Sequence, residues 1–307
     1  MEDYEPIGDR PADYAVPRDF RFVDAHVHLF DHARPELAWS FHDPGWEHPR
    51  LKGAWRLDAP AFSVPELVTL AAGLGVDKVV HVQVADASCG PVAETAWLQS
   101  LADRYGWPNG IVAPCALAAP SAADDIAHQA AYANFRGVRD TGDPDLIGTP
   151  EWNRGFAALA GLGASCDLMI TLAHYDQALR VARSHPEATI VLEHAGLPVV
   201  SKLDSYFEEW KGALARIAAA ENIVVKISAL SSGAVPNFFT ASIRRWVLTC
   251  FEHFGTGRAL FASNWPMDNL FTTYPRLLAS FRKLTEQLTP AERGAVFATN
   301  AERVYRI

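Results

Sequence analysis

The sequence predicts an α/β protein, a (β/α)8 TIM barrel formed by a single domain over residues 1–307. Short apolar, β-rich segments alternate eight times with longer helical segments rich in Ala and Leu. This alternation favours right-handed crossovers and a parallel sheet, and eight repeats favour a closed barrel over an open sheet. An open dinucleotide-binding sheet would need a G-x-G-x-x-G turn, and the sequence contains none.

The expected strands are almost continuously apolar, as in KVVHVQVA and TIVLEHAG, because packed side chains cover both faces of a barrel strand. They span residues 22–30, 78–85, 110–117, 135–141, 167–173, 189–196, 223–230 and 260–266. Ala- and Leu-rich helices are expected between them, with Pro65, Pro150 and Pro275 near helix starts.

Three segments lie outside the repeat. Residues 1–20 are expected to form an extended arm over the barrel. The segment 31–61, with Trp39, Trp46 and Trp55, is too long for an ordinary strand–helix loop and is expected to cover the active face. Residues 289–307 are expected to add an extra C-terminal helix.

Composition excludes several classes of function. No run of eighteen apolar residues exists, so no membrane span is expected, and the acidic first twenty residues do not resemble a secretory signal. The net charge of −9 argues against a nucleic-acid partner. Four widely spaced cysteines indicate buried thiols in a reduced, cytoplasmic compartment. A small-molecule substrate is the expected partner.

Polar residues gather at the expected carboxyl ends of the strands, where barrels of this kind place their chemistry. His26 and His28 are two residues apart on the first strand, so both imidazoles should face one point and could bind one divalent ion. A pair of core histidines is the alternative, and an isolated pair would favour it. The other polar strand ends make a site the better interpretation; they are His81 and Gln83, Arg139 and Asp140, His174, Glu193 and His194, Lys226 and Ser228, and Asn264 and Trp265.

At these residues the chain resembles the amidohydrolase superfamily, in its branch of sugar-lactone and pyrone-dicarboxylate lactonases. The resemblance runs from about Arg21 to Ile307. It rests on FVDAHVHLFD, RGVRD, DLMITLAHYDQ, LEHAGLP, NIVVKISAL and the closing NAERVYRI. It implies a TIM-barrel hydrolase that opens a small lactone or related cyclic ester, and barrels of this type often form homodimers.

The eighth-strand motif departs from the family pattern. The family has Gly-Ser-Asp-Trp-Pro where this chain has Ala262-Ser263-Asn264-Trp265-Pro266, and that Asp normally activates water and touches the metal. An amide cannot accept the proton. Either His26, His28 and His174 hold zinc or manganese weakly, or the site works without a metal. Asp268, Asp140 and Glu193 are the carboxylates that could replace the missing base.

The resemblance also suggests roles for the remaining residues. Water would be oriented by His26, His28 and a carboxylate such as Asp268, while His174 and His194 would polarise the carbonyl or protonate the leaving oxygen. The substrate would contact Arg139, Lys226, His81, Asp140 and Trp265. The two cations would pair with substrate carboxylates or hydroxyls; structural ion pairs are an equally good interpretation of both.

Two rival functions remain open at this point. A decarboxylase or lactone isomerase would use the same barrel mouth without activating water, and related branches of the superfamily do decarboxylate. A catalytically silent binding protein would explain the loss of the carboxylate at Asn264, although it would not explain why the other polar strand ends are kept.

Overall fold

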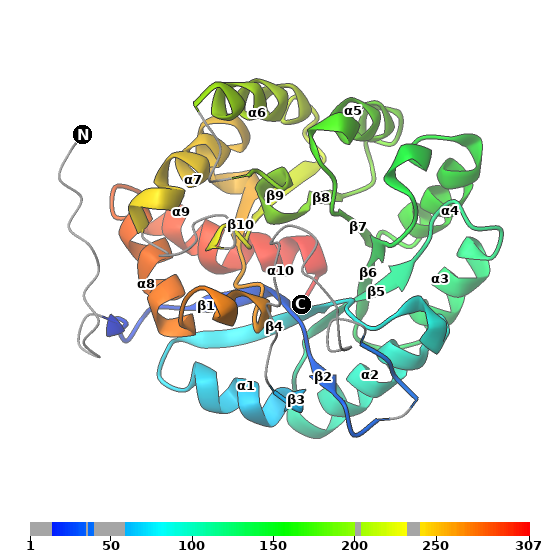
Figure 1. Ribbon diagram of the computed structural model, residues 1–307, viewed down its shortest axis with the longest axis horizontal. Coiled ribbons are helices and arrows are strands. Elements are labelled where there is room, and N and C mark those ends of the chain that lie inside the picture. Colours follow the sequence, from blue (N-terminus) through cyan, green and yellow to red (C-terminus); the bar gives the residue numbers. More distant parts are fainter. Residues whose placement is uncertain (1–13, 35, 40–58, 200–203, 232–239) are drawn as a thin grey trace.

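Eight parallel strands form a barrel surrounded by helices (Figure 1). The computed structural model describes residues 14–34, 36–39, 59–199, 204–231 and 240–307. Each strand pairs with the next along the chain, which confirms the predicted (β/α)8 architecture. The strands are β1 (Phe22–Val27), β4 (Val76–Val82), β5 (Gly110–Cys115), β6 (Phe135–Asp140), β7 (Ser165–Leu168), β8 (Ile190–Leu192), β9 (Ile223–Ile227) and β10 (Ala259–Phe261).

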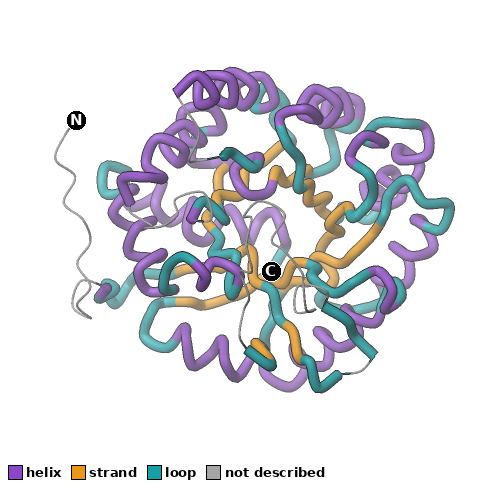
Figure 2. The backbone as a smooth tube through the Cα atoms, in the orientation of Figure 1, coloured by secondary structure: helices purple, strands orange, loops and turns teal. Residues whose placement is uncertain are grey.

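The helices form the outer layer of the barrel (Figure 2). They are α1 (Val64–Ala71), α2 (Ala93–Tyr105), α3 (Ala122–Ala130), α4 (Pro150–Gly161), α5 (Tyr175–Ser184), α6 (Asp204–Ile217), α7 (Thr240–Phe254) and α8 (Tyr274–Leu284). Pro65, Pro150 and Pro275 lie in the first turns of their helices, where the missing N–H is not needed. Among the described helices, none has the length and apolarity needed to cross a bilayer.

Alternation along the strands produces two layers of core. Residues pointing outward from the strands pack under the helices, as Phe22, Ile111 and Phe261 do. Residues pointing inward are mostly valine and alanine, such as Val23 and Val80, and fill the barrel. The inner layer also includes Tyr305 and other residues from the end of the chain.

Backbone hydrogen bonds close the barrel at its mouth. Val27 pairs in parallel with Trp265, beyond the end of β10. The Asn264 amide donates to the His26 carbonyl at 2.9 Å, and the His28 amide donates to the Trp265 carbonyl at 2.7 Å. The seam between the first and last strands is therefore tied by the segments that carry the predicted site residues.

Several strands are shorter than the sequence predicted. The first ends at Val27, and Phe30–Asp31 instead forms β2, which pairs antiparallel with β3 (Ala61–Phe62). The fifth, sixth and eighth strands give way to 3-10 turns, one of which holds His174. Trp39 is buried against Trp97. Most of the predicted arm, together with Trp46 and Trp55, lies outside the described residues.

The end of the chain plugs the bottom of the barrel, where Figure 1 shows α10 crossing the centre of the ring. The sequence predicted one extra helix here; the structure has α9 (Pro290–Gly294), a π-helical turn (Ala295–Thr299) and α10 (Asn300–Tyr305). Glu302 of α10 accepts hydrogen bonds from Arg21 at 3.0 Å and from Lys78 at 2.7 Å. These contacts fix α10 to the starts of β1 and β4.

Replacing Glu302 with glutamine should destabilise the protein at neutral pH but not in acid. Hydrogen bonds from Arg21, and then from Lys78, lower the pKa of Glu302 from 4.5 to about 2. A lowered carboxyl pKa contributes stability that is complete above the unfolded pKa and disappears as pH falls through the folded one. We expect Glu302→Gln to lose on the order of 1 kcal/mol at pH 7, since partly exposed ion pairs contribute little.

Urea denaturation of wild type and variant between pH 7 and pH 3 measures this difference. The difference in unfolding free energy between wild type and Glu302→Gln should narrow steadily as the pH falls below the ordinary glutamate pKa of 4.5. The exposed Glu208 is the matched control, and Glu208→Gln should leave the unfolding curve unchanged. If the difference in unfolding free energy between wild type and Glu302→Gln stayed constant with pH, the lowered pKa of Glu302 would not contribute to stability as described.

Candidate active site

Two facing imidazoles mark the centre of the barrel mouth. His26 lies within β1 and His28 just past its end, yet their Nε2 atoms are 3.1 Å apart and their rings are nearly perpendicular, at 83°. Burial is the main cause that lowers the pKa of both rings well below the usual histidine value. Both side chains are therefore neutral near pH 7, with lone pairs available for a ligand.

The hydrogen-bond partners define which nitrogens carry protons. The Val82 carbonyl can only accept, so the His28 Nδ1–H donates to it at 2.9 Å and leaves His28 Nε2 bare. With Glu193 ionised, either tautomer of neutral His26 then leaves a conflict. A proton on Nε2 leaves a bare Nδ1 against Glu193 Oε1, 3.5 Å away; a proton on Nδ1 leaves two bare Nε2 atoms facing each other.

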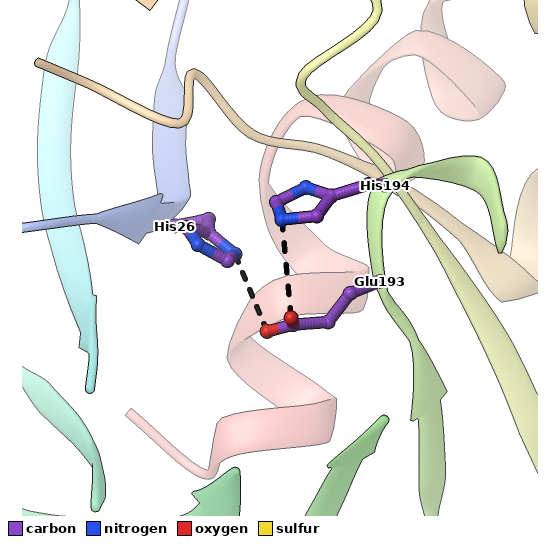
Figure 3. A group of neighbouring side chains, drawn as sticks. All are labelled: His26, Glu193 and His194. Atoms are coloured by element: carbon purple, nitrogen blue, oxygen red, sulfur yellow. Dashed lines mark ion pairs between the residues drawn. The ribbon is translucent and has the colours of Figure 1, made fainter. Parts of the chain in front are cut away.

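A divalent cation that accepts both Nε2 lone pairs removes this conflict, so the donors fit such an ion. The His26 Nδ1–H is then directed at Glu193, the arrangement in which a carboxylate orients a metal-binding histidine. Within the described part of the chain, neither Glu193 oxygen nor His26 Nδ1 has an aligned hydrogen bond. The nearby group of His26, Glu193 and His194, with ligand atoms within 4.8 Å of one another, adds oxygen and nitrogen donors suited to zinc (Figure 3).

Glu193 lies among several polar side chains of the site and is fully buried. Its Oε2 lies 2.9 Å from Arg139 Nη2 and 3.9 Å from His194 Nε2, and its Oε1 lies 3.9 Å from Lys226 Nζ. Burial raises the pKa of Glu193, while Arg139 and Lys226 oppose that shift. Two cations on different sides therefore stabilise the carboxylate in the barrel interior.

The backbone takes a left-handed conformation in the turn directly after Glu193. His194 has φ 54° and Ala195 has φ 52°, a region that side-chain-bearing residues seldom adopt. The hydroxyl of Tyr175 donates to the Gly196 carbonyl at 2.6 Å and supports the turn. The turn leaves Glu193 inside the barrel and places His194 at the mouth, where its Nδ1 meets the Ser228 hydroxyl at 2.8 Å.

The Asn264 amide and the Asp268 carboxylate form a pair beside the two imidazoles. Asn264 Nδ2 donates to Asp268 Oδ1 at 2.8 Å, and the Ser231 hydroxyl donates to Asp268 Oδ2. The Asn264 side chain also hydrogen-bonds His28. Asn264 has φ 57°, a backbone conformation that asparagine tolerates better than most residues. The Asn264 side chain therefore links the buried Asp268 carboxylate to His28.

His174 does not join the His26 cluster. The predicted fifth strand ends at Leu168, and a 3-10 turn over Leu172–His174 carries the imidazole away from strand geometry. Its Nε2 lies 3.0 Å from Asp145 Oδ1. Among the described residues, the group of potential ligands contains His26, Glu193 and His194, and His174 is not part of it.

His81 and Asp140 are committed to internal contacts. His81 Nδ1 accepts the Leu29 amide at 3.1 Å, so its Nε2–H points to Glu94, 3.3 Å away. Asp140 accepts from the Trp152 indole at 2.6 Å and from two backbone amides. We had expected both residues to contact substrate; in the structure, His81 instead fixes the chain just after His28.

The three remaining residues expected to contact substrate also have protein partners. Trp265 is 3% exposed and its ring lies 5.3 Å from that of Tyr274. Lys226 is fully buried and donates to Asp167 at 2.6 Å, and Arg139 pairs with Glu193. For both cations the structure therefore shows the ion-pair alternative.

Two carboxylates of the site are weakly marked in the sequence. Glu193 is one of several candidate bases there, and Asp167 is not among the predicted site residues. A signal for Asp167 exists in the sequence, because an acidic residue in an apolar strand needs a buried partner, and Lys226 is a lysine in the middle of another such strand.

Comparisons with known proteins identify the family of this chain. A family model described as amidohydrolase matches residues 23–307, so the chain belongs to the amidohydrolase family. The protein y4mH of Sinorhizobium fredii is 33% identical over 94% of this chain and 99% of its own length. The L-fucono-1,5-lactonase of Burkholderia ambifaria is 29% identical over 93% of this chain and 95% of that enzyme.

The same fold occurs in a crystal structure of a Burkholderia multivorans amidohydrolase with bound zinc. It superposes with a TM-score of 0.78 at 23% identity, covering 94% of this chain and all of that one (100%). The family match confirms the predicted amidohydrolase membership, and the structural match agrees with the predicted fold.

Proposed function

We propose that this protein hydrolyses a small, uncharged lactone at the mouth of the barrel. The observation that carries the proposal is the pair of facing, neutral imidazoles of His26 and His28, with Glu193 on one side and Asp268 on the other. The 29% identity to a sugar lactonase over nearly the whole chain supports the same reaction class.

His26 and His28 would hold a divalent ion, zinc or manganese, through their Nε2 atoms. When bound, such an ion polarises a carbonyl and lowers the pKa of water. Glu193 Oε1, 3.5 Å from His26 Nδ1, would orient the His26 ring, and the Val82 carbonyl orients His28 by accepting a hydrogen bond from its Nδ1–H. The protein thus presents both nitrogens in fixed directions before substrate arrives.

Asp268 would act as the general base. Asn264 and Ser231 hold its two oxygens in place, so the carboxylate can accept a proton that Asn264 itself cannot. His194 would act through Nε2, which lies 3.9 Å from Glu193 Oε2, since its Nδ1 is engaged by Ser228. From there it can donate to the carbonyl oxygen or to the leaving oxygen of the opened ring.

The ion pairs of Arg139 and Lys226 favour a substrate without a carboxylate. Arg139 pairs with Glu193, and Lys226 pairs with Asp167. A substrate carboxylate would have to compete with a buried protein carboxylate for either cation. The hydroxyls of a sugar lactone need only hydrogen bonds.

A substrate panel tests the proposal. Purified protein would be assayed with L-fucono-1,5-lactone and D-glucono-1,5-lactone, with 2-pyrone-4,6-dicarboxylate, and with 2,6-dihydroxybenzoate, before and after chelation. We expect turnover of at least one neutral lactone and loss of turnover on chelation. Turnover of 2,6-dihydroxybenzoate alone would support a decarboxylase, and melting shifts without any turnover would support a binding protein.

A further inference from the structure

A buried polar chain runs from the end of the protein to the active site. The Tyr305 hydroxyl of α10 donates to Asp167 Oδ2 at 2.7 Å, and Lys226 Nζ donates to the same oxygen at 2.6 Å. Lys226 Nζ also lies 3.9 Å from Glu193 Oε1, which in turn lies 3.5 Å from His26 Nδ1. Lys226, Asp167 and Glu193 have fully buried side chains.

Asp167 is held from three directions. Its Oδ1 accepts from the Ser165 hydroxyl at 3.0 Å, while Oδ2 accepts from Lys226 and Tyr305. The Lys226 ammonium lies 5.2 Å from the centre of the Tyr305 ring, so that ring covers it. The lysine is consequently enclosed in the barrel, and its position depends on α10 as well as on the strands.

The charges around Glu193 balance only when Lys226 is present. Arg139 and Lys226 are opposed by Glu193 and Asp167, and Coulomb interactions are strong where water is excluded. Each oxygen of Glu193 has its own cation, Arg139 for Oε2 and Lys226 for Oε1. The oxygen on the lysine side is the one that faces His26.

We propose that Lys226, held by Asp167 and Tyr305, is a positioning residue that fixes Glu193 Oε1 beside His26 Nδ1. The end of the chain thereby takes part in orienting the imidazole of the active site. This inference rests on the proposed function, in which the direction of the His26 ring matters for the reaction. Lys226 acts through Glu193 and does not contact the substrate.

Kinetics of Lys226→Met and Glu193→Gln, singly and together, test the proposal on the lactone with the highest turnover. Lys226→Met should lower kcat on the order of 10²-fold, as small misplacements of reacting groups do, with KM within about twofold. The double variant should be no slower than Glu193→Gln alone, because both changes act through one carboxylate. A raised KM, or a loss that persists without the Glu193 charge, would mean that Lys226 binds substrate directly.

Tyr305→Phe perturbs the buried polar chain while keeping every charged side chain. It should lower kcat several-fold with KM unchanged, because Asp167 and Lys226 lose one restraint. Thr285→Val is the matched control, since it also removes one buried hydroxyl, and it should leave kcat unchanged. Equal kinetics for Tyr305→Phe and wild type would exclude the α10 part of the proposal.

Lys226→Met leaves Asp167 without its cation and could fail to fold. Lys226→Met/Asp167→Asn removes both charges of the pair, a change that buried sites often tolerate. This double variant should fold and still show the loss in kcat. Wild-type kcat in a folded double variant would overturn the role of Lys226.

A readout independent of activity separates this inference from the proposed function. The melting temperatures of Lys226→Met, Glu193→Gln and their double variant form a cycle. We expect the double variant to melt above the temperature that adding the two single shifts predicts. Additive shifts would show that the two charges are not coupled, whether or not any lactone is hydrolysed.

Discussion

Asp268→Asn is expected to abolish most lactone hydrolysis while leaving the fold intact. General-base catalysis contributes on the order of 10²- to 10⁴-fold, and kcat should fall by that factor. The asparagine has the same shape as the aspartate. It can still accept from Asn264, and its amide can donate to the Ser231 hydroxyl, so the contacts of the loop survive.

Steady-state kinetics and a thermal melt of the same preparation measure this effect. Asp77→Asn is the matched control, because Asp77 lies on the surface, where it pairs with Arg21 at the opposite end of the barrel. It should keep wild-type kcat. If Asp268→Asn were active and Glu193→Gln were not, Glu193 would be the base and Asp268 a structural partner of Asn264.

His28→Asn should weaken metal binding and remove activity together. Changing a residue that only hydrogen-bonds a metal-binding side chain typically lowers metal affinity about 10- to 100-fold. Loss of a direct donor should therefore raise the metal Kd at least on the order of 10²-fold. The asparagine side chain can still donate to the Val82 carbonyl, which limits the structural damage. Because the wild-type pKa of His28 is lowered, the lost group is a neutral lone pair and not a charge.

Competition between protein and a chelating indicator for zinc and for manganese measures the Kd. His185→Asn is the matched control, since His185 contacts Glu187 near the end of α5. It should bind metal as wild type does. Unchanged affinity in His28→Asn would place the ion on His26, Glu193 and His194 instead, and chelator-resistant turnover by the wild type would indicate a metal-free site.

The sequence predicted the barrel and the central histidines because both depend on local patterns. The two-residue spacing of His26 and His28 marks the pair in the sequence. Strict alternation from Phe22, which points outward, and Val23, which points inward, would turn His26 outward. A register shift between Asp24 and Val27 breaks that alternation, and the His26 ring lies beside Glu193 inside the barrel. His174 was misplaced, because a strand pattern cannot show that residues 172–174 form a turn.

The sequence marks Asp167 and Lys226 as possible buried partners, but it cannot show that the two side chains meet. Asp167 is on β7 and Lys226 on β9, with β8 between them. In a barrel, alternate strands contribute the side chains of one interior layer. Strand register decides which of these side chains meet, and a shift by one residue would turn each away. The sequence therefore left Lys226 equally suited to a substrate or to an ion pair.

The backbone hydrogen bonds that close the barrel involve residues of the candidate site. The seam at the mouth is tied by the His28 amide to Trp265 and by the Asn264 amide to His26. A breathing motion that separates β1 from β10 would part the imidazoles from Asn264 and Asp268 in the same event. Hydrogen exchange at those two amides should therefore report how often the seam between β1 and β10 opens. Ligands that bridge the seam should slow that exchange.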